Sequence, residues 1–213
     1  MEIVKSIDKS IIVSAYADIY VKNHFMHLTL GEGSTIGSIV MNCNPFTYGH
    51  RYLIKEALKT VDYLFIFVVE EDRSLFSFEE RFSMIKMGTE DLSNVIVAPS
   101  GQLILSQTTF PEYFVKVADE DIVQNVEYDI TLFAEQIAPR LNITYRFVGE
   151  EPEDEVTNEY NLAMKRILPS HGIRLVEIPR KENGKRIISA SRARNYLENG
   201  KYDELKTLIP ETT

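Results

Sequence analysis

Short apolar runs alternate with helical patterns from residue 36 onward, and this alternation constrains the fold more than any other feature of the chain. The apolar runs are rich in Val, Ile, Phe and Tyr and predict strands at about 36–41, 63–69, 94–98, 144–148 and 174–178. The remaining patterns predict helices at 50–60, 78–87, 110–119, 129–141, 156–168 and 191–199. Strands that are apolar throughout and joined by helices are typical of a parallel sheet covered on both faces. We therefore expect a Rossmann-like, doubly wound α/β domain over residues 36–213, with ligands at the carboxyl ends of the strands.

Residues 1–35 do not follow this alternation and are interpreted as a short N-terminal extension. Two apolar stretches, 11–21 and 24–30, predict either a hairpin or a contact between the subunits of a homo-oligomer. His24 and His27 lie in the second stretch without a third metal-binding partner. Such a pair is more typical of packing or surface residues, so no metal ligand is predicted.

Composition excludes several functional classes. The 213 residues are 44% hydrophobic and carry a net charge of −9, which disfavours a surface for nucleic acids. No apolar run approaches the ~20 residues that cross a bilayer, and the single Cys43 excludes an internal disulfide. We interpret the chain as a cytoplasmic, soluble domain that binds neither membranes nor nucleic acids, with Cys43 as a packing residue.

The turn after the first predicted strand has the features of a phosphate-binding site. The strand gives way to a helix near His50, and a helix start presents free backbone N–H groups and the positive end of its dipole. Pro45 and Gly49 shape the turn, while Thr47 and His50 add a hydroxyl and an imidazole. The nucleotide-binding candidates in this segment are Asn44, Pro45, Phe46, Thr47, Gly49 and His50.

A basic segment near the C-terminus is a second anion-binding candidate. Between Arg180 and Arg194 the chain has six Lys or Arg residues and one acid, Glu182. In an acidic protein this local excess of positive charge predicts a focused anion site.

Two motifs resemble the signatures of the HxGH-type nucleotidyltransferase superfamily. Thr47, Gly49 and His50 form Thr-x-Gly-His, in which the first position of the family motif is His or Thr. Residues 188–194, Ile-Ser-Ala-Ser-Arg-Ala-Arg, look like the Ile-Ser-x-Ser/Thr-x-x-Arg motif at the start of a C-terminal helix. Their order and context make this resemblance far more specific than either motif alone.

The resemblance narrows to the C-terminal domain of citrate lyase ligase. Residues 37–54, 71–81, 109–114, 148–164 and 177–180 match that domain in order, together with residues 188–194. The family, as the resemblance implies, uses ATP to adenylylate acetate and passes the acetyl group to the thiol of the citrate lyase acyl carrier subunit. AMP and pyrophosphate are released, and Mg²⁺ is expected with the triphosphate.

One departure from the family pattern leaves alternatives open. The full-length ligase also carries an N-terminal acetyltransferase-like domain, whereas this sequence has some 35 residues in that place. A stand-alone nucleotidyltransferase that uses ATP or CTP on another small carboxylate or a phosphorylated metabolite is therefore the main alternative. A non-catalytic nucleotide-binding module is disfavoured because Thr47, His50, Ser189 and Arg194 are all present.

Nucleotidyl transfer needs positioning and preplaced positive charge more than a protein nucleophile, and this requirement suggests a role for each candidate. We assign His50 to the α-phosphate and Thr47 to the adjacent phosphates. Ser189, Ser191 and Arg194 are assigned to the β- and γ-phosphates. Gly149 and Glu150, after the fourth strand, are expected to line the base and ribose.

Four further basic residues are predicted to bind the substrate or pyrophosphate. Arg73 and Arg81 could hold the carboxylate or phosphate of the acceptor, although Arg81 could equally pair with Glu79 or Glu80. Lys185 and Arg186 are candidates for a loop that closes over pyrophosphate, or are simply solvated.

Overall fold

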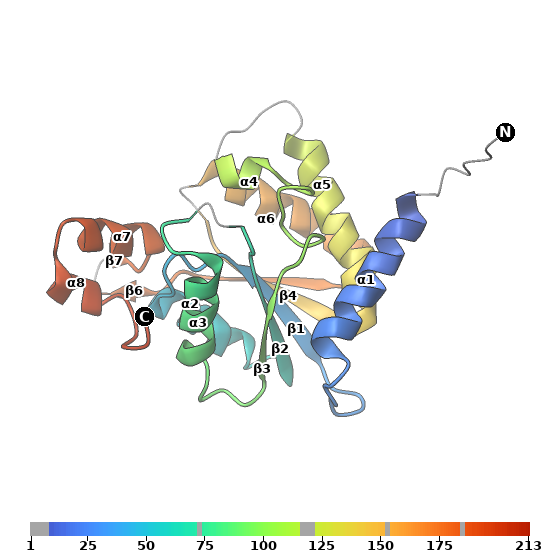
Figure 1. Cartoon of the computed structure of the whole chain (residues 1–213), viewed down its shortest axis with the longest axis horizontal. Helices are drawn as coiled ribbons and strands as arrows, with labels where there is room; N and C mark the ends of the chain where they lie inside the picture. Colours follow the sequence, from blue (N-terminus) through green and yellow to red (C-terminus); the bar gives the residue numbers. More distant parts are fainter. Residues whose placement is uncertain (1–8, 72–73, 116–121, 152–153, 184–185) are drawn as a thin grey trace.

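Five parallel strands form one central sheet with the order β3-β2-β1-β4-β5. The computed structural model describes residues 9–71, 74–115, 122–151, 154–183 and 186–213 (Figure 1). The strands are β1 (Ile36–Met41), β2 (Tyr63–Val68), β3 (Val95–Pro99), β4 (Ile143–Gly149) and β5 (Arg174–Ile178). All five lie within two residues of the predicted ranges, which confirms the parallel sheet.

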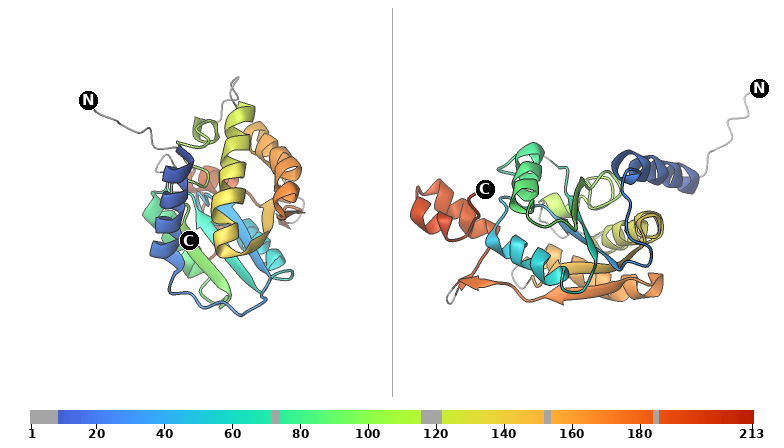
Figure 2. Two further views of the ribbon diagram at one scale, coloured as in Figure 1. Left: turned by 90° about the vertical axis from the view of Figure 1, so that its right-hand side faces the viewer. Right: turned by 90° about the horizontal axis from the view of Figure 1, so that it is seen from below.

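Helices cover both faces of the sheet, as the sequence predicted. The helices after β1 are α2 (Tyr48–Ala57), α3 (Phe78–Gly88), α4 (Glu112–Val115), α5 (Ile122–Leu132), α6 (Glu155–Ile167), α7 (Ala190–Glu198) and α8 (Tyr202–Lys206), of which α7 and α8 lie beside the sheet and not on its faces. Successive side chains of β2 point to opposite faces of the sheet, so β2 contributes to two apolar clusters. Phe65 and Phe67 pack in the cluster that contains α5 and α6, whereas Leu64 and Ile66 pack in the cluster that contains α2 and α3. The doubly wound fold is thus confirmed (Figures 1 and 2).

The prediction of a hairpin in the N-terminal extension is wrong, because this segment forms helix α1 (Lys9–Phe25). The ring of Phe25 meets that of Phe65 edge to face at 5.2 Å, and the hydroxyl of Tyr20 donates to the carbonyl of Pro99 at 2.6 Å. Apolar and polar residues are mixed around α1 without one apolar stripe, so the segment lacks the 3.6-residue periodicity that distinguishes a helix from a strand. The contact between subunits stays a prediction.

Helices differ from the sequence prediction in other places as well. The helix expected at 129–141 begins at Ile122 and ends in a π-helical turn (Phe133–Ile137) and a 3₁₀ turn (Pro139–Leu141). Of the helix expected at 110–119, α4 covers Glu112–Val115, and residues 116–119 lie outside the described ranges. Another 3₁₀ turn (Leu168–His171) follows α6, and α8 was not predicted.

The C-terminal helices pack against the start of α2 and bring the two sequence motifs together. Ile188, Ala193, Leu205 and Leu208 form a small apolar cluster with Tyr48 at its edge. The backbone N–H of Tyr48 donates to the carbonyl of Leu208 at 2.9 Å. Residues 44–50 and 188–194 therefore meet at one edge of the sheet. The two short strands β6 (Glu182–Asn183) and β7 (Arg186–Ile187) pair antiparallel before α7.

Along the stretches that the structure describes, no helix combines the length and the apolar character that a membrane crossing requires.

Candidate active site

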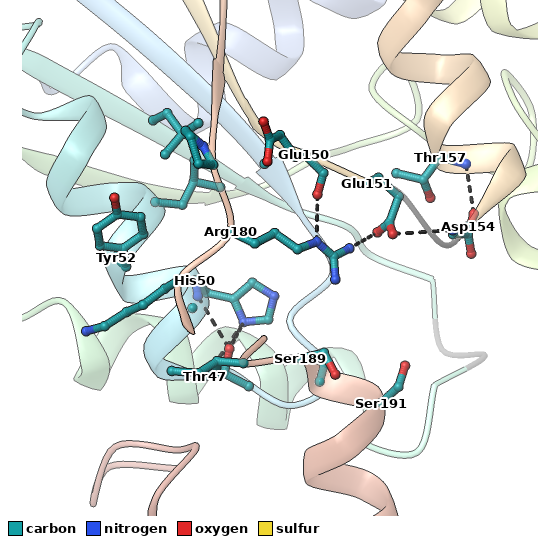
Figure 3. A pocket seen from close by; sticks show the side chains of 18 residues that line it. Thr47, His50, Tyr52, Glu150, Glu151, Asp154, Thr157, Arg180, Ser189 and Ser191 are labelled. Carbon is teal, nitrogen blue, oxygen red and sulfur yellow. Dashed lines mark hydrogen bonds and ion pairs between the residues drawn. The ribbon is translucent and has the colours of Figure 1, made fainter. Parts of the chain in front are cut away.

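A cavity of about 490 Å³ opens at the carboxyl ends of β1, β4 and β5. In the strand order, β2 and β3 lie on one side of β1, and β4 and β5 lie on the other. The strand order therefore reverses between β1 and β4, and ligands of open α/β sheets bind at such a switch point. Four segments line the cavity, and Figure 3 shows their side chains facing one space. The lining residues lie in 47–53, 149–157, 178–181 and 188–191.

Thr47 and His50 form a reciprocal cap at the start of α2. The hydroxyl of Thr47 accepts the backbone N–H of His50 at 3.4 Å, and the backbone N–H of Thr47 donates to Nδ1 of His50 at 3.0 Å. A ring nitrogen that accepts from a backbone N–H carries no proton in the neutral imidazole. The proton of neutral His50 is therefore on Nε2, which makes Nε2–H the donor that the ring can offer to a ligand.

The His50 ring is held in a neutral state. Its imidazole stacks with the buried ring of Phe46, with centroids 5.9 Å apart and planes inclined by 16°. Burial, and then the positive charge of Arg180, lower the pKa of His50 to about 4. The side chain thus supplies a directed N–H dipole near neutral pH, and a net positive charge must come from another group.

Gly49 allows α2 to approach the second motif closely. A Cβ at this position would lie 3.1 Å from the carbonyl oxygen of Ile188 and 3.4 Å from Oγ1 of Thr47. The small residue therefore lets the segment before α7 lie directly against the Thr47–His50 cap.

Ser189 and Ser191 line the cavity at the start of α7. Ser189 is the N-cap, and its Oγ accepts the backbone N–H of Arg192 at 3.3 Å. Its hydroxyl proton remains a donor, and the first N–H groups of α7 point in the same direction. This arrangement is suited to an anion.

Arg194 joins the two motifs and is not among the residues that line the cavity. Its guanidinium donates to the carbonyl of Asn44 at 2.5 Å and to Oγ of Ser191 at 3.1 Å. Asn44 in turn accepts the backbone N–H of Phe76 through Oδ1 at 3.2 Å. Asn44, Pro45 and Phe46 likewise lie behind the cavity wall and shape the turn that presents Thr47 and His50.

Gly149 and Glu150 line the opposite wall, where the sequence placed them. The backbone N–H of Glu150 donates to the carbonyl of Ile178 at 3.1 Å, which fixes the ends of β4 and β5 together. Nδ2 of Asn161 donates to the carbonyl of Gly149 at 3.1 Å.

Sequence reasoning placed Arg180 and Glu151 near the site only as parts of longer segments and did not predict that they pair. Nε of Arg180 donates to the carbonyl of Glu150 at 2.6 Å, and Nη2 forms an ion pair with the carboxylate of Glu151. Both side chains are about four-fifths buried, with 20% and 17% of their side-chain surface exposed. The excess of basic residues from Arg180 onward was the available signal, but no pattern in the sequence indicated the partner 29 residues earlier.

Two other lining residues extend this wall. Oδ1 of Asp154 caps α6 by accepting the backbone N–H of Thr157 at 2.8 Å. Nζ of Lys181 lies 5.7 Å from the centroid of the Tyr52 ring, at the exposed side of the cavity.

Arg81 does not line the cavity, and the structure contradicts its assignment to a direct contact with substrate. Its side chain is completely buried at the start of α3. The guanidinium donates to backbone carbonyls at 2.8–3.1 Å, those of Asn42, Val69, Glu71 and Phe76. These bonds stabilise the loops that follow β1 and β2, because each occupies a carbonyl outside the sheet.

Three predicted basic residues cannot be placed in the site. Arg73 and Lys185 lie outside the described residues, and the side chain of Arg186 is not described. Within the described ranges, no three His, Cys, Asp or Glu side chains gather as ligands for a metal ion.

Comparison with known proteins agrees with the geometry. A family model for the citrate lyase ligase C-terminal domain matches residues 36–213. A citrate pro-3S-lyase ligase of Haemophilus influenzae is 46% identical over 190 residues, which cover 85% of this chain and 56% of the relative. A phosphopantetheine adenylyltransferase of Petrotoga mobilis is 29% identical over 91 residues, covering 42% of this chain and 56% of that protein. This chain thus spans about half the length of the ligase that it resembles.

A solved structure shares the fold. Pantoate–β-alanine ligase from Francisella tularensis superposes with a TM-score of 0.51 at 11% identity, over 90% of this chain and 76% of that one. Sheet order, motif placement and the match over residues 36–213 together show that the chain belongs to the family of the citrate lyase ligase C-terminal domain.

Proposed function

We propose that this protein is an ATP-dependent adenylyltransferase that activates acetate as acetyl-AMP and serves the acyl carrier subunit of citrate lyase. Membership of the ligase family over residues 36–213 is the observation that carries this proposal. The cavity supports it, because two helix starts with hydroxyl and imidazole donors converge at the switch point of the sheet.

The first step is a displacement at the α-phosphorus of ATP. An acetate oxygen attacks the phosphorus, the bond between phosphorus and the bridging α–β oxygen breaks, and pyrophosphate leaves. Charge develops on the phosphoryl oxygens in this step, so donors that are already in place lower the barrier. Nε2–H of His50 is the donor for the α-phosphate, and Thr47 supports it by holding the ring in that orientation.

The second motif is assigned to the leaving group. Ser189, Ser191 and the N-terminus of α7 provide hydroxyl and N–H donors for the β- and γ-phosphates. Arg194 holds Ser191 against the turn at Asn44 and acts on the phosphates through that position. We propose that Gly149 and Glu150 face the base and ribose. Lys185 and Arg186 remain proposed as contacts to pyrophosphate.

Mg²⁺ is proposed to enter with the triphosphate. Of the described carboxylates on the cavity wall, Glu151 pairs with Arg180 and Asp154 caps α6, which leaves the exposed Glu150 as the one that could contribute a ligand. The ion would therefore be held chiefly by phosphate oxygens and water, where it neutralises charge on the leaving group.

The second step is transfer of the acetyl group to the carrier thiol. The sulfur attacks the acetyl carbonyl, the bond to AMP breaks, and a thioester forms. The chain spans 56% of its ligase relative, so the part of the relative that is not matched here is a candidate contributor to this step. For this reason a nucleotidyl transfer with ATP or CTP to another small carboxylate or phosphorylated metabolite is kept as the second candidate.

Pyrophosphate release tests the proposal. Wild-type protein is incubated with Mg²⁺, ATP or CTP, and acetate, with His50→Ala as the control for contaminating activity. Release with ATP and acetate, followed by acetylation of the purified acyl carrier subunit, is the expected result. Release with a different acceptor would replace the substrate and keep the chemistry. Absence of release with every acceptor tested, in a protein that binds ATP, would refute the adenylyltransferase activity.

A further inference from the structure

The cavity needs a positive charge that its predicted catalytic residues do not supply. His50 is a neutral donor, and Arg194 is bonded to Asn44 and Ser191 behind the cavity wall. Among the described residues that line the cavity, the cationic side chains are Arg180 and Lys181. Lys181 is exposed and lies over the ring of Tyr52, whereas Arg180 is mostly buried.

The orientation of Arg180 fits the role of a phosphate ligand. Figure 3 shows its side chain crossing the cavity from the end of β5, with the guanidinium between the His50 ring and Glu151 and above Ser189 and Ser191. Nε and Nη2 are bonded to Glu150 and Glu151, and Nη1 makes no hydrogen bond to any described residue. A guanidinium held from one side keeps its other edge available for two oxygens of an anion.

We propose that Arg180 is a further catalytic residue, whose guanidinium binds the phosphoryl group that is transferred, and that Glu151 competes with this group for the guanidinium. This inference rests on the proposed nucleotidyl transfer and adds a residue to it. Arg180 stabilises the charge that builds on the α-phosphate, and His50 directs a hydrogen bond to the same group. Glu151 forms an ion pair with the same guanidinium, so its carboxylate competes with the phosphate for Arg180.

A ligand series locates the contact. Dissociation constants for adenosine, AMP, ADP and ATP are measured by calorimetry for wild type and for Arg180→Met. Loss of a charge-assisted hydrogen bond is expected to weaken AMP binding by about tenfold or more and to leave adenosine binding within about twofold. Arg192→Met is the matched control, because it removes one charge from the same basic segment outside the cavity lining. An equal loss for adenosine and AMP, or no loss for either, would overturn the proposal.

Substitution of Glu151 gives a second test, in which AMP affinity is expected to rise and not to fall. Glu151→Gln frees Arg180 from a competing carboxylate, so AMP should bind more tightly than to wild type. In the Arg180→Met background the same change should have a much smaller effect, because the group that it frees is gone. A gain of equal size in both backgrounds would mean that Glu151 simply repels phosphate and that Arg180 is not involved.

Turnover separates a catalytic role from a structural one. Arg180→Lys keeps the charge and is expected to recover part of the pyrophosphate release that Arg180→Met loses, chiefly in kcat. If wild type and Arg180→Met bind ATP equally well, this inference is refuted and the proposed function stands. Wild-type protein that binds no nucleotide would sink both.

Discussion

The backbone N–H of Thr47 donates to Nδ1 of His50 at 3.0 Å, and this bond determines which edge of the imidazole can act on a ligand. It makes Nδ1 an acceptor and leaves the proton of the neutral ring on Nε2. One side chain therefore caps α2 with one nitrogen and offers a hydrogen bond with the other. The cap and the proposed hydrogen-bond donor to the nucleotide can be separated by substitution.

Asn and Gln at position 50 should divide these two functions. His50→Asn places an acceptor near the position of Nδ1 and retains the cap, whereas His50→Gln places a donor near Nε2. We expect His50→Asn and His50→Ala to reduce pyrophosphate release by ~10²-fold or more, since each removes a preplaced donor. His50→Gln should retain more turnover than His50→Asn. Equal rates for wild type and His50→Ala would remove His50 from the mechanism.

Stability of the same three variants tests the cap. His50→Ala should lower the free energy of unfolding by about 0.5–2 kcal/mol, the usual cost of losing a helix cap. His50→Asn should lose less, as measured by urea denaturation. If His50→Asn and His50→Ala are equally destabilised, the Thr47–His50 bond contributes little.

The titration of His50 should be unusual. Burial and the charge of Arg180 lower its pKa to about 4 from the ordinary value of 6.5. Between these values the unfolded chain binds more protons than the folded one, so stability should rise with pH across this window. The contribution is fully present above about pH 6.5 and is lost as the pH falls toward 4. NMR of the imidazole should give a low pKa in the free protein and a higher one in Arg180→Met. A free-protein pKa near 6.5 would contradict the neutral state of the ring.

Much of this architecture could be predicted from the sequence, because the features that specify it are local. Each strand of the sheet is a short run rich in apolar residues, and the Thr47–His50 and Ser189 caps lie within four residues of their partners. The features that were missed depend on tertiary contacts. Arg180 meets Glu151 across neighbouring strand ends, and Arg81 is surrounded by carbonyls from two loops. An arginine in a sequence does not show whether its partner is a ligand or the backbone of its own chain.

Gly49→Ala should separate the two motifs. The added Cβ would meet the backbone oxygen of Ile188 at 3.1 Å, and a backbone atom yields less readily than the end of a side chain. We expect a loss of about 1–3 kcal/mol in unfolding free energy, as for overpacking in a close contact. ATP affinity should fall as well, because Ser189 moves away from His50. Gly149→Ala is the stability control, since its Cβ would have no atom within 4 Å. Equal stability of the two variants would contradict the close approach.

Arg81→Lys should act on the fold rather than on substrate binding. An ammonium group cannot reach the four carbonyls that the guanidinium joins, and each buried acceptor left unpaired costs about 1–3 kcal/mol. We expect a loss of about 3 kcal/mol or more in urea denaturation. Lys86→Gln, at an exposed site in the last turn of the same helix, should stay within about 0.5 kcal/mol. Unchanged stability with a raised KM for the acceptor would restore the substrate-binding role.

Tyr160→Phe should destabilise the protein in a pH-dependent manner. The hydroxyl of Tyr160 donates to Oδ2 of Asp129 at 2.6 Å, and the backbone N–H of Leu105 donates to Oδ1 at 2.8 Å. Burial raises the pKa of Asp129, and these hydrogen bonds counter the rise because they favour the ionised carboxylate. A raised folded-state pKa means that stability falls as the pH rises through the window above 3.8.

Loss of the Tyr160 hydroxyl raises the pKa of Asp129 further and widens that window. We expect a cost of about 1 kcal/mol at pH 4 and roughly 2–3 kcal/mol at pH 8, because a hydrogen bond to an ionised carboxylate is worth more than one to a protonated carboxyl. Urea denaturation at the two pH values measures the difference. Tyr128 is exposed and directly precedes Asp129 in the sequence. Tyr128→Phe should therefore change stability by less than about 0.5 kcal/mol at either pH. An equal loss for Tyr160→Phe at pH 4 and pH 8 would mean that Asp129 keeps one protonation state throughout.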